Sequence, residues 1–258
     1  MGAYERNAAR NYDHFYEIKK YSQEVKFIDE TTGGVFGKRI LDVGCGTGTH
    51  AALLSDMHPS SILGIDTSAE MIEIASEKAK GKSNLGFVNV SLTDLHLTEK
   101  YDVVVSMFNV VNHIMTLREV SCFFEEISKR MVPHGHLIFD CWNGIAAIKD
   151  APRTQCRQYE IPHIGHITTD TTPEINLIKS NVRMKTHVVV EKSGTMVDSY
   201  DYTLEHTLWT PKVFVDLIEE NDMVIENIHG GNYELVHPAT EDDYKIIFVC
   251  RKRRNNND

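Results

Sequence analysis

The sequence of 258 residues lacks features that would mark several classes of protein. No apolar run approaches the ~20 residues that span a bilayer, and no apolar N-terminal segment resembles a signal peptide. The five cysteines include no C-x-x-C pair, which argues against a disulfide framework and against a zinc site. The formal net charge of −10 offers no basic face for a phosphate backbone. We therefore expect a cytoplasmic protein that binds no metal, no membrane and no nucleic acid.

The remaining composition is ordinary for a globular protein, with 41% apolar and 25% charged residues. The basic cluster at 251–254 abuts an asparagine-rich end, so we expect residues 252–258 to form a disordered tail.

Three alternating glycines, Gly44, Gly46 and Gly48, form the most informative motif. They follow the apolar run 40–43, which predicts a short buried strand, and precede an apolar segment that predicts a helix. A strand that turns through glycines into a helix presents unpaired N–H groups at the carboxyl end of a parallel sheet. The absent Cβ atoms let a ligand lie against that backbone. The motif predicts a nucleoside-binding turn.

Two acids beside the glycines indicate which nucleoside is bound. Asp66 ends a second predicted strand, 61–65, where a carboxylate can accept hydrogen bonds from ribose hydroxyls. A dinucleotide fingerprint needs its third glycine one position later and carries no acid in the strand. Asp42 would repel a pyrophosphate but suits a cationic amino group. The alternatives are a glycine turn without a ligand and an NAD site with a degenerate glycine.

Strand and helix patterns alternate from Arg39 to Asp140, which predicts an α/β protein with parallel strands and right-handed crossovers. Within it, a helix over 117–131 is expected to stop at 133–135 before a strand over 136–140. Segments 175–190 and 196–208 alternate polar and apolar residues, which predicts an antiparallel β insertion. Thr210 and Pro211 then open a helix, and two last strands follow at 223–228 and 244–250.

This order resembles the class I S-adenosylmethionine (SAM) methyltransferases, whose Rossmann-like sheet has seven strands with the last one antiparallel. Within that family the chain is similar to bacterial enzymes that N-methylate nucleotide-linked amino sugars. The similar stretches are 11–24, 40–50, 64–71, 101–114 and 205–211. The resemblance implies N-terminal lid helices (1–35), a SAM-binding core (36–149), an acceptor-side β insertion (150–208) and a C-terminal completion of the core (209–251).

The resemblance also implies a set of cofactor-binding residues. The methionine part of SAM falls to Asp42 and the glycine turn, the ribose to Asp66, and the cofactor carboxylate to Lys19. Contacts around the adenine and the methyl group fall to Tyr12, Thr67, Met71, Ser91, Leu92 and Met107. The family usually has Gly-Asp after the third strand, whereas this chain has Val90-Ser91, so Ser91 or Asp94 would receive the adenine amino group.

The candidate catalytic residues are His113, Asn109 and Tyr16. His113 follows the fourth strand, where ligands gather, and a histidine near neutrality can take a proton from a methylated amine. Asn109 would orient the acceptor, and Tyr16 would close over the methyl group. A capping or core role is the alternative for His113, and Trp142 either stacks on the acceptor or packs in the core.

We therefore expect a SAM-dependent methyltransferase acting on a small-molecule acceptor, the amine of a nucleotide-linked amino sugar, and a possible homodimer. Arg153, Arg157 or Arg183 would reach the phosphates of that acceptor. The alternatives are an O-methyltransferase acting on a sugar, a phosphorylated group or another small metabolite, an NAD-dependent oxidoreductase, and a SAM-binding module without turnover.

Overall fold

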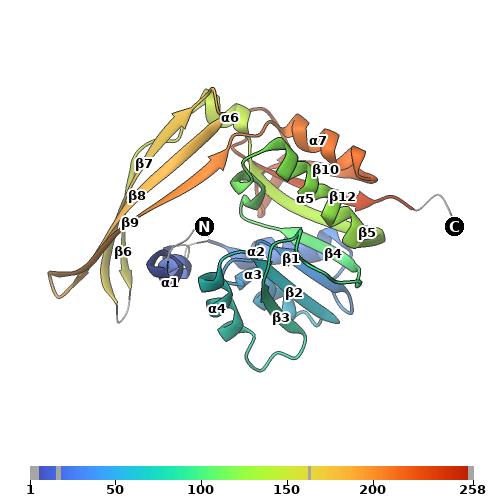
Figure 1. Ribbon diagram of the computed structural model, residues 1–258, viewed down its shortest axis with the longest axis horizontal. Coiled ribbons are helices and arrows are strands. Elements are labelled where there is room, and N and C mark those ends of the chain that lie inside the picture. The colour runs from blue at the N-terminus through green and yellow to red at the C-terminus, as the bar shows by residue number, and fades with distance from the viewer. Residues whose placement is uncertain (1–5, 16–18, 162–163, 255–258) are drawn as a thin grey trace.

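The computed structural model describes residues 6–15, 19–161 and 164–254, which form two sheets and their covering helices (Figure 1). The main sheet has eight strands in the order β11-β10-β12-β5-β4-β1-β2-β3. Its strands are β1 (Arg39–Val43), β2 (Ser61–Asp66), β3 (Leu85–Asn89), β4 (Tyr101–Ser106), β5 (Met131–Trp142), β10 (Met223–Asn232), β11 (Leu235–Pro238) and β12 (Lys245–Lys252).

Five strands of this sheet, β1 to β5, run parallel, and β12 runs antiparallel to both of its neighbours. The predicted α/β class and the antiparallel final strand are confirmed. The eighth strand, β11, was not predicted, because it has four exposed residues, ends in proline and pairs only with β10 at the sheet edge.

Helices cover both faces of the main sheet because its central strands are apolar on both sides. Val103 and Val104 are fully buried in different clusters: Val104 packs with α5 and α7, and Val103 packs with α2 and α3. The helices are α1 (Arg6–Phe15), α2 (Tyr21–Thr31), α3 (Thr49–Ser55), α4 (Ala69–Lys78), α5 (Leu117–Arg130), α6 (Gly144–Lys149) and α7 (Pro211–Glu220), with a 3-10 turn η1 (Val110–His113). Among the described helices, none is long and apolar enough to cross a membrane.

The second sheet is the expected insertion, with four antiparallel strands in the order β6-β7-β8-β9. Figure 1 shows it as a separate arched wall with α1 beneath it. The strands are β6 (Gln155–Ile161), β7 (Gly165–Asn176), β8 (Asn181–Lys192) and β9 (Thr195–Thr207). The predicted strand 175–190 is divided by a turn at 177–180, whose residues continued the alternating pattern. Phe15 of α1 packs on this sheet with Ile167 and Val188.

Two local expectations were wrong. Helix α5 ends at Arg130 and β5 begins at Met131, so Pro133 and His134, with its positive φ, lie within the strand at a register shift against β4 instead of separating the helix from the strand. The basic cluster at the C-terminal end is partly structural, because β12 continues through Lys252. The Arg251 guanidinium lies 2.7 Å from Glu226, and the Lys252 ammonium contacts the Ser128 hydroxyl. Residues 255–258 of the predicted tail lie outside the described residues.

Candidate active site

The three glycines of the turn after β1 all have left-handed φ angles, of 72°, 54° and 73°. A Cβ on Gly44 would meet Val110, and one on Gly48 would meet the ring of Phe87 at 2.4 Å. A Cβ on Gly46 would meet nothing within 4 Å. The outer glycines are therefore required by packing as well as by φ, while Gly46 borders open space in front of α3.

Asp66 fixes the shape of this turn from the end of β2. One carboxylate oxygen accepts the Gly46 N–H at 2.9 Å, and the other accepts the Ser68 N–H at 2.8 Å. Ser68 then caps α4 by accepting the Met71 N–H at 3.3 Å. Because a carboxylate oxygen can accept two hydrogen bonds, Asp66 keeps acceptor capacity for a ligand.

Asp42 lies behind the same turn and is 1% exposed. Burial, and then the nearby charge of Asp66, raise the pKa of Asp42 to about 7. Its Oδ2 atom has no hydrogen-bond partner among the described residues. A positively charged ligand group nearby would favour its ionised form.

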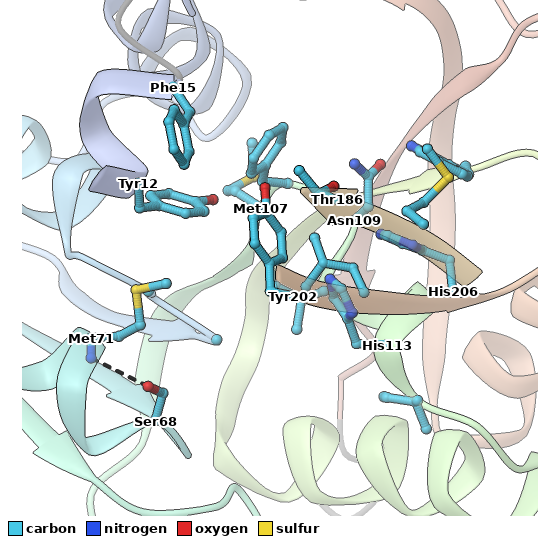
Figure 2. Close-up of a pocket in the computed structure, with 18 of the residues that line it drawn as sticks. Tyr12, Phe15, Ser68, Met71, Met107, Asn109, His113, Thr186, Tyr202 and His206 are labelled. Carbon is cyan, nitrogen blue, oxygen red and sulfur yellow. Dashed lines mark hydrogen bonds between the residues drawn. The ribbon is translucent and has the colours of Figure 1, made fainter. Parts of the chain in front are cut away.

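A cavity of about 790 Å³ opens between the glycine turn, the loop after β4 and the second sheet (Figure 2). Most predicted site residues line it: Tyr12, Gly44, Gly46, Asp66, Thr67, Met71, Ser91, Leu92, Met107, Asn109 and His113. Asp42, Gly48 and Lys19 do not line it. Tyr16 lies outside the described residues.

Lys19 was expected to meet the cofactor carboxylate, and in this structure it has partners within the protein. Its ammonium lies 2.9 Å from the Glu24 carboxylate and 4.0 Å from the centre of the Phe108 ring. Burial lowers the pKa of Lys19 despite the charge of Glu24. Glu24 also contacts His50 at 2.5 Å, so His50 packs behind the turn.

The loop after β4 carries two consecutive non-glycine residues with positive φ, Phe108 (71°) and Asn109 (61°). Such backbone persists where the surroundings hold it. The Asn109 N–H donates to Asp140 at 2.6 Å, and Asp140 also receives the Tyr233 hydroxyl at 2.6 Å and the Lys245 ammonium at 3.0 Å. Although burial raises it, the charge of Lys245 holds the pKa of Asp140 below its usual range. The Asn109 Oδ1 atom is buried without a partner in the described chain.

His113 lies on η1 beside a second histidine, His206 of β9, which the sequence analysis did not single out (Figure 2). Their ring centres are 4.5 Å apart, and His206 is stacked on Trp142 at 4.6 Å with an angle of 8°. Trp142 packs in a small apolar cluster and also lines the cavity, while a stack on the acceptor stays a prediction. His206 follows Glu205 in a strand pattern, and no local signal marks it.

The wall opposite the glycine turn is rich in hydroxyl groups. It consists of side chains from the second sheet, among them Tyr159, Thr169, Thr171, Thr186 and Tyr202. Arg153 and Arg157 also line the cavity, whereas Arg183 does not. The Arg153 guanidinium is exposed and lies 3.0 Å from Asp150. The wall therefore offers polar contacts along its length and basic groups near one end.

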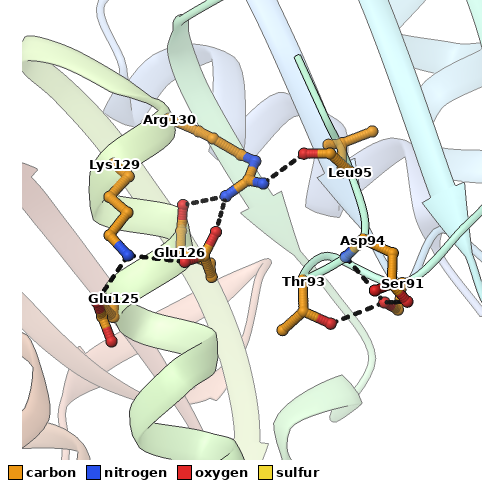
Figure 3. Close-up of polar contacts among 8 residues, drawn as sticks. All are labelled: Ser91, Thr93, Asp94, Leu95, Glu125, Glu126, Lys129 and Arg130. Atoms are coloured by element: carbon orange, nitrogen blue, oxygen red, sulfur yellow. Dashed lines mark hydrogen bonds and ion pairs between the residues drawn. The ribbon is translucent and has the colours of Figure 1, made fainter. Parts of the chain in front are cut away.

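The loop after β3 is tied to α5 (Figure 3). The Ser91 hydroxyl donates to Asp94 at 2.6 Å, and the Arg130 guanidinium donates to the Leu95 carbonyl at 2.6 Å. Arg130 is itself held by Glu126 at 2.5 Å. Arg130 thus anchors the loop that carries Ser91 and Leu92 to the cavity.

The residues present fit a nucleoside with a cationic tail. Open space at Gly46 and the carboxylate of Asp66 suit a ribose beside the turn. The unpartnered oxygens of Asp42 and Asn109 are acceptors that lack donors. Groups of three or more His, Cys, Asp or Glu side chains arranged to hold a metal are absent from the described residues.

Part of the main-sheet region is similar to a known domain family. Residues 40–135 match the model of the methyltransferase domain. The ubiquinone biosynthesis O-methyltransferase of Vibrio atlanticus is 30% identical over 148 residues, covering 54% of this chain and 60% of that protein. The chain spans about half the length of the curated relatives it matches.

Two solved structures resemble the chain over nearly its whole length. An S-adenosylmethionine-dependent methyltransferase from Clostridium acetobutylicum has a TM-score of 0.81 and 16% identity, covering 96% of this chain and 98% of that one. The sugar N-methyltransferase KedS8 from a Streptoalloteichus species has a TM-score of 0.74 and 17% identity, covering 94% and 93%. Residues 40–135 are thus similar to methyltransferase domains, and the whole chain has the fold of these two solved methyltransferases.

Proposed function

We propose that the chain is a SAM-dependent methyltransferase that methylates the amine of an amino sugar carried by a nucleotide. The observation that carries this proposal is the cavity, which joins the turn at Gly46 and Asp66 to the hydroxyl-rich wall of the second sheet. One end suits a nucleoside donor and the other a polar acceptor. Transfer between two bound molecules needs both in a single water-excluding space.

The donor end would hold SAM through the glycine turn and Asp66, with Met71 and Leu92 beside the adenine. Bound SAM supplies a methyl group on a positively charged sulfur. Asp42 adds a buried negative charge when ionised, which favours a cationic ligand electrostatically. Tyr12 lines the cavity from α1 and lies edge-on to Phe108, with ring centres 6.3 Å apart. These aromatic rings cover the donor from the side of α1.

The acceptor end would hold the sugar through hydroxyls of the second sheet and the phosphates through Arg153 and Arg157. His113 would take the proton that the amine releases, because its Nδ1 atom lies 3.2 Å from the Glu205 carbonyl. A carbonyl only accepts, so Nδ1 carries the hydrogen and Nε2 keeps a lone pair. The structural resemblance to a sugar N-methyltransferase supports this choice of acceptor.

The alternative is transfer to an oxygen atom of a sugar, a phosphorylated group or another small metabolite. A sequence relative with the name of an O-methyltransferase supports it. An alcohol is a poor nucleophile near neutral pH, so this reaction would depend more strongly on His113 as a base.

The proposal is tested in two stages. Calorimetry with SAM and with its demethylated product S-adenosylhomocysteine should show binding, and the absence of heat with both would refute a SAM-dependent enzyme. Nucleotide-linked amino sugars and the same compounds with a hydroxyl replacing the amine are then incubated with SAM. We expect a mass gain of methyl groups on the amines alone. Methylation of the hydroxyl compounds alone would establish the alternative.

A further inference from the structure

Three neighbouring rings form one end of the cavity, and they come from three different elements: His206 is stacked on Trp142 and tilted by 42° against His113. Trp142 ends β5, His113 ends η1, and His206 lies near the end of β9. His206 is 4.6 Å from Trp142 and 4.5 Å from His113, measured between ring centres. His206 is 6% exposed and lines the cavity with the other two (Figure 2). Its position is fixed by contacts with both rings.

The two imidazoles differ in their hydrogen bonds. His113 has a defined partner, the Glu205 carbonyl, which leaves its Nε2 atom as a proton acceptor. The Nδ1 atom of His206 is buried and has no hydrogen-bond partner in the part of the chain that the structure describes. No protein group found there would stabilise a proton on this nitrogen.

The surrounding charges support one protonated ring at most: burial lowers the pKa of His113, and the Glu205 carbonyl and the charge of Asp66 oppose this effect. The described carboxylates that line the cavity are Asp66 at the donor end and Asp150, which pairs with Arg153. The Glu205 carboxylate accepts a hydrogen bond from Asn181 at 2.5 Å. Besides the two histidines and Arg153, the other ionisable groups that line the described cavity are Tyr12, Arg157, Tyr159, Tyr202 and Tyr244. The described lining therefore places no free carboxylate beside the rings that would stabilise two imidazolium charges.

We propose that His113 and His206 act as a coupled pair that holds at most one proton. His113 receives this proton. His206, which is stacked on Trp142, stays neutral and keeps the His113 ring in place. The proposal rests on the proposed methyl transfer to an amine. In it His206 is a positioning residue that acts through His113. Burial lowers the pKa of both rings, and burial together with the charge of a protonated His113 lowers that of His206 to about 3.

The reaction balances with one proton. The neutral amine attacks the methyl carbon, so a nitrogen–carbon bond forms while the carbon–sulfur bond breaks and its electron pair leaves with sulfur. The methylated amine now carries one positive charge and one extra proton. That proton passes to Nε2 of His113 and afterwards to solvent. The one-proton capacity of the pair matches the one proton that each transfer releases.

Histidine titration by NMR tests the coupling without any acceptor. The full chain, labelled in its histidine rings, is titrated from acid to neutral pH with S-adenosylhomocysteine present. We expect His113 to titrate below the ordinary pKa of histidine, and we expect His206 to stay neutral while His113 titrates. In a His113→Asn variant the pKa of His206 should rise, because the neighbouring charge is gone. An unchanged His206 titration in that variant, or protonation of both rings in one step, would overturn the coupled pair. His187→Asn is the matched control, since His187 pairs with Asp201 and does not line the cavity.

Activity variants test the positioning role. His206→Ala should lower kcat for an amine acceptor about tenfold or more and leave the affinity for SAM unchanged, because misplaced catalytic groups slow transfer strongly. His206→Phe keeps a stacked ring and should restore part of the rate. A His206→Ala variant with the kcat and pH profile of the unmodified chain would refute the role. Failure of the unmodified chain to bind SAM would instead refute the proposed function, while the NMR coupling could still be observed.

Discussion

The carboxylate of Asp13 on α1 lies 2.7 Å from the ammonium of Lys78 on α4 and accepts the Thr47 hydroxyl at 2.6 Å. On the side of the second sheet, the Asn11 amide donates to the Tyr200 hydroxyl at 2.9 Å. Helix α1 therefore connects the glycine turn with the insertion, across the cavity that Tyr12 lines.

The first prediction concerns this connection. Lys78→Met should speed the dissociation of SAM several-fold, because α1 loses its ionic attachment to α4. The free energy of unfolding should fall by no more than about 1 kcal/mol, since the pair is partly exposed. Stopped-flow fluorescence measures the dissociation rate. Lys80→Met, which removes an exposed pair with Glu77 and leaves α1 untouched, is the control. Equal dissociation rates in both variants would refute a retaining role of α1.

The second prediction concerns Asp66. Asp66→Ala should weaken SAM binding about 10- to 100-fold, because hydrogen bonds to a charged acceptor contribute about 1.5–3 kcal/mol. The turn also loses the bond to the Gly46 N–H. Calorimetry measures the affinity, and Asp56→Ala, at an exposed pair with Lys82, serves as the comparison. Unchanged affinity in Asp66→Ala would remove the basis of the donor site.

The third prediction concerns pH and Asp42. Its pKa is raised from 3.8 to about 7 in the folded chain. Between those values the folded chain holds a proton that the unfolded chain has released, so the contribution of Asp42 to the free energy of unfolding falls as pH rises through this window. Binding of a cation favours the ionised form, so the affinity for SAM should increase with pH up to about 7.

A substitution separates the two effects of Asp42. At pH 8, Asp42→Asn should raise the melting temperature of the free chain, because a buried unpaired charge is removed. The same variant should bind SAM more weakly and lose the increase of affinity with pH. Calorimetry at several pH values, together with thermal unfolding, measures both. If Asp42→Asn were less stable than the unmodified chain at pH 8, burial of the ionised Asp42 carboxylate would not destabilise the folded chain.

The fourth prediction concerns Asp140 and Lys245. Asp140→Asn leaves the partly buried Lys245 ammonium without its charged partner and should lower the free energy of unfolding by about 3 kcal/mol, the low end for a buried pair. Tyr233→Phe removes one hydrogen bond to Asp140 and should have a smaller effect, about 1 kcal/mol. Denaturant unfolding measures the free energy of unfolding of the two variants. Equal losses of this free energy in both would show that the Asp140–Lys245 ion pair contributes nothing beyond the hydrogen bond.

The fifth prediction concerns Arg130 (Figure 3). Arg130→Lys keeps the charge but cannot reproduce the fork that joins Glu126 and the Leu95 carbonyl. SAM affinity should fall several-fold while the affinity for methionine alone stays the same, because only the adenine side of the site moves. Lys129→Arg, on the exposed side of the same helix, is the control. If Arg130→Lys weakened methionine binding as much as SAM binding, the substitution would not act through the adenine side of the site.

The end of the cavity at the glycine turn was predictable because its signals are local in the chain. Gly44, Gly46 and Asp66 belong to strand-to-helix turns, where sequence spacing alone determines which groups meet at the sheet edge. The antiparallel insertion was predictable from its alternation, although the turn at 177–180 was not, because Leu177 and Ile178 continue the apolar pattern.

Contacts between distant segments were less predictable. At the end of the cavity near the second sheet, His206 meets His113 across 93 positions, and behind the loop after β4, Lys245 meets Asp140 across 105. No spacing rule connects such pairs, and both depend on burial for their chemistry. The placement of Lys19 against Glu24 was missed for a different reason: the two residues are close in the sequence, but an exposed and a buried lysine look identical in a sequence.

The division of the cavity between two sheets has a consequence for how such a protein can change. Substitutions in β6 to β9 alter one wall of the cavity, while the glycine turn, Asp66 and their hydrogen bonds stay intact. If the proposed reaction holds, a new acceptor preference can therefore arise by changes in the second sheet alone, with the SAM site unchanged.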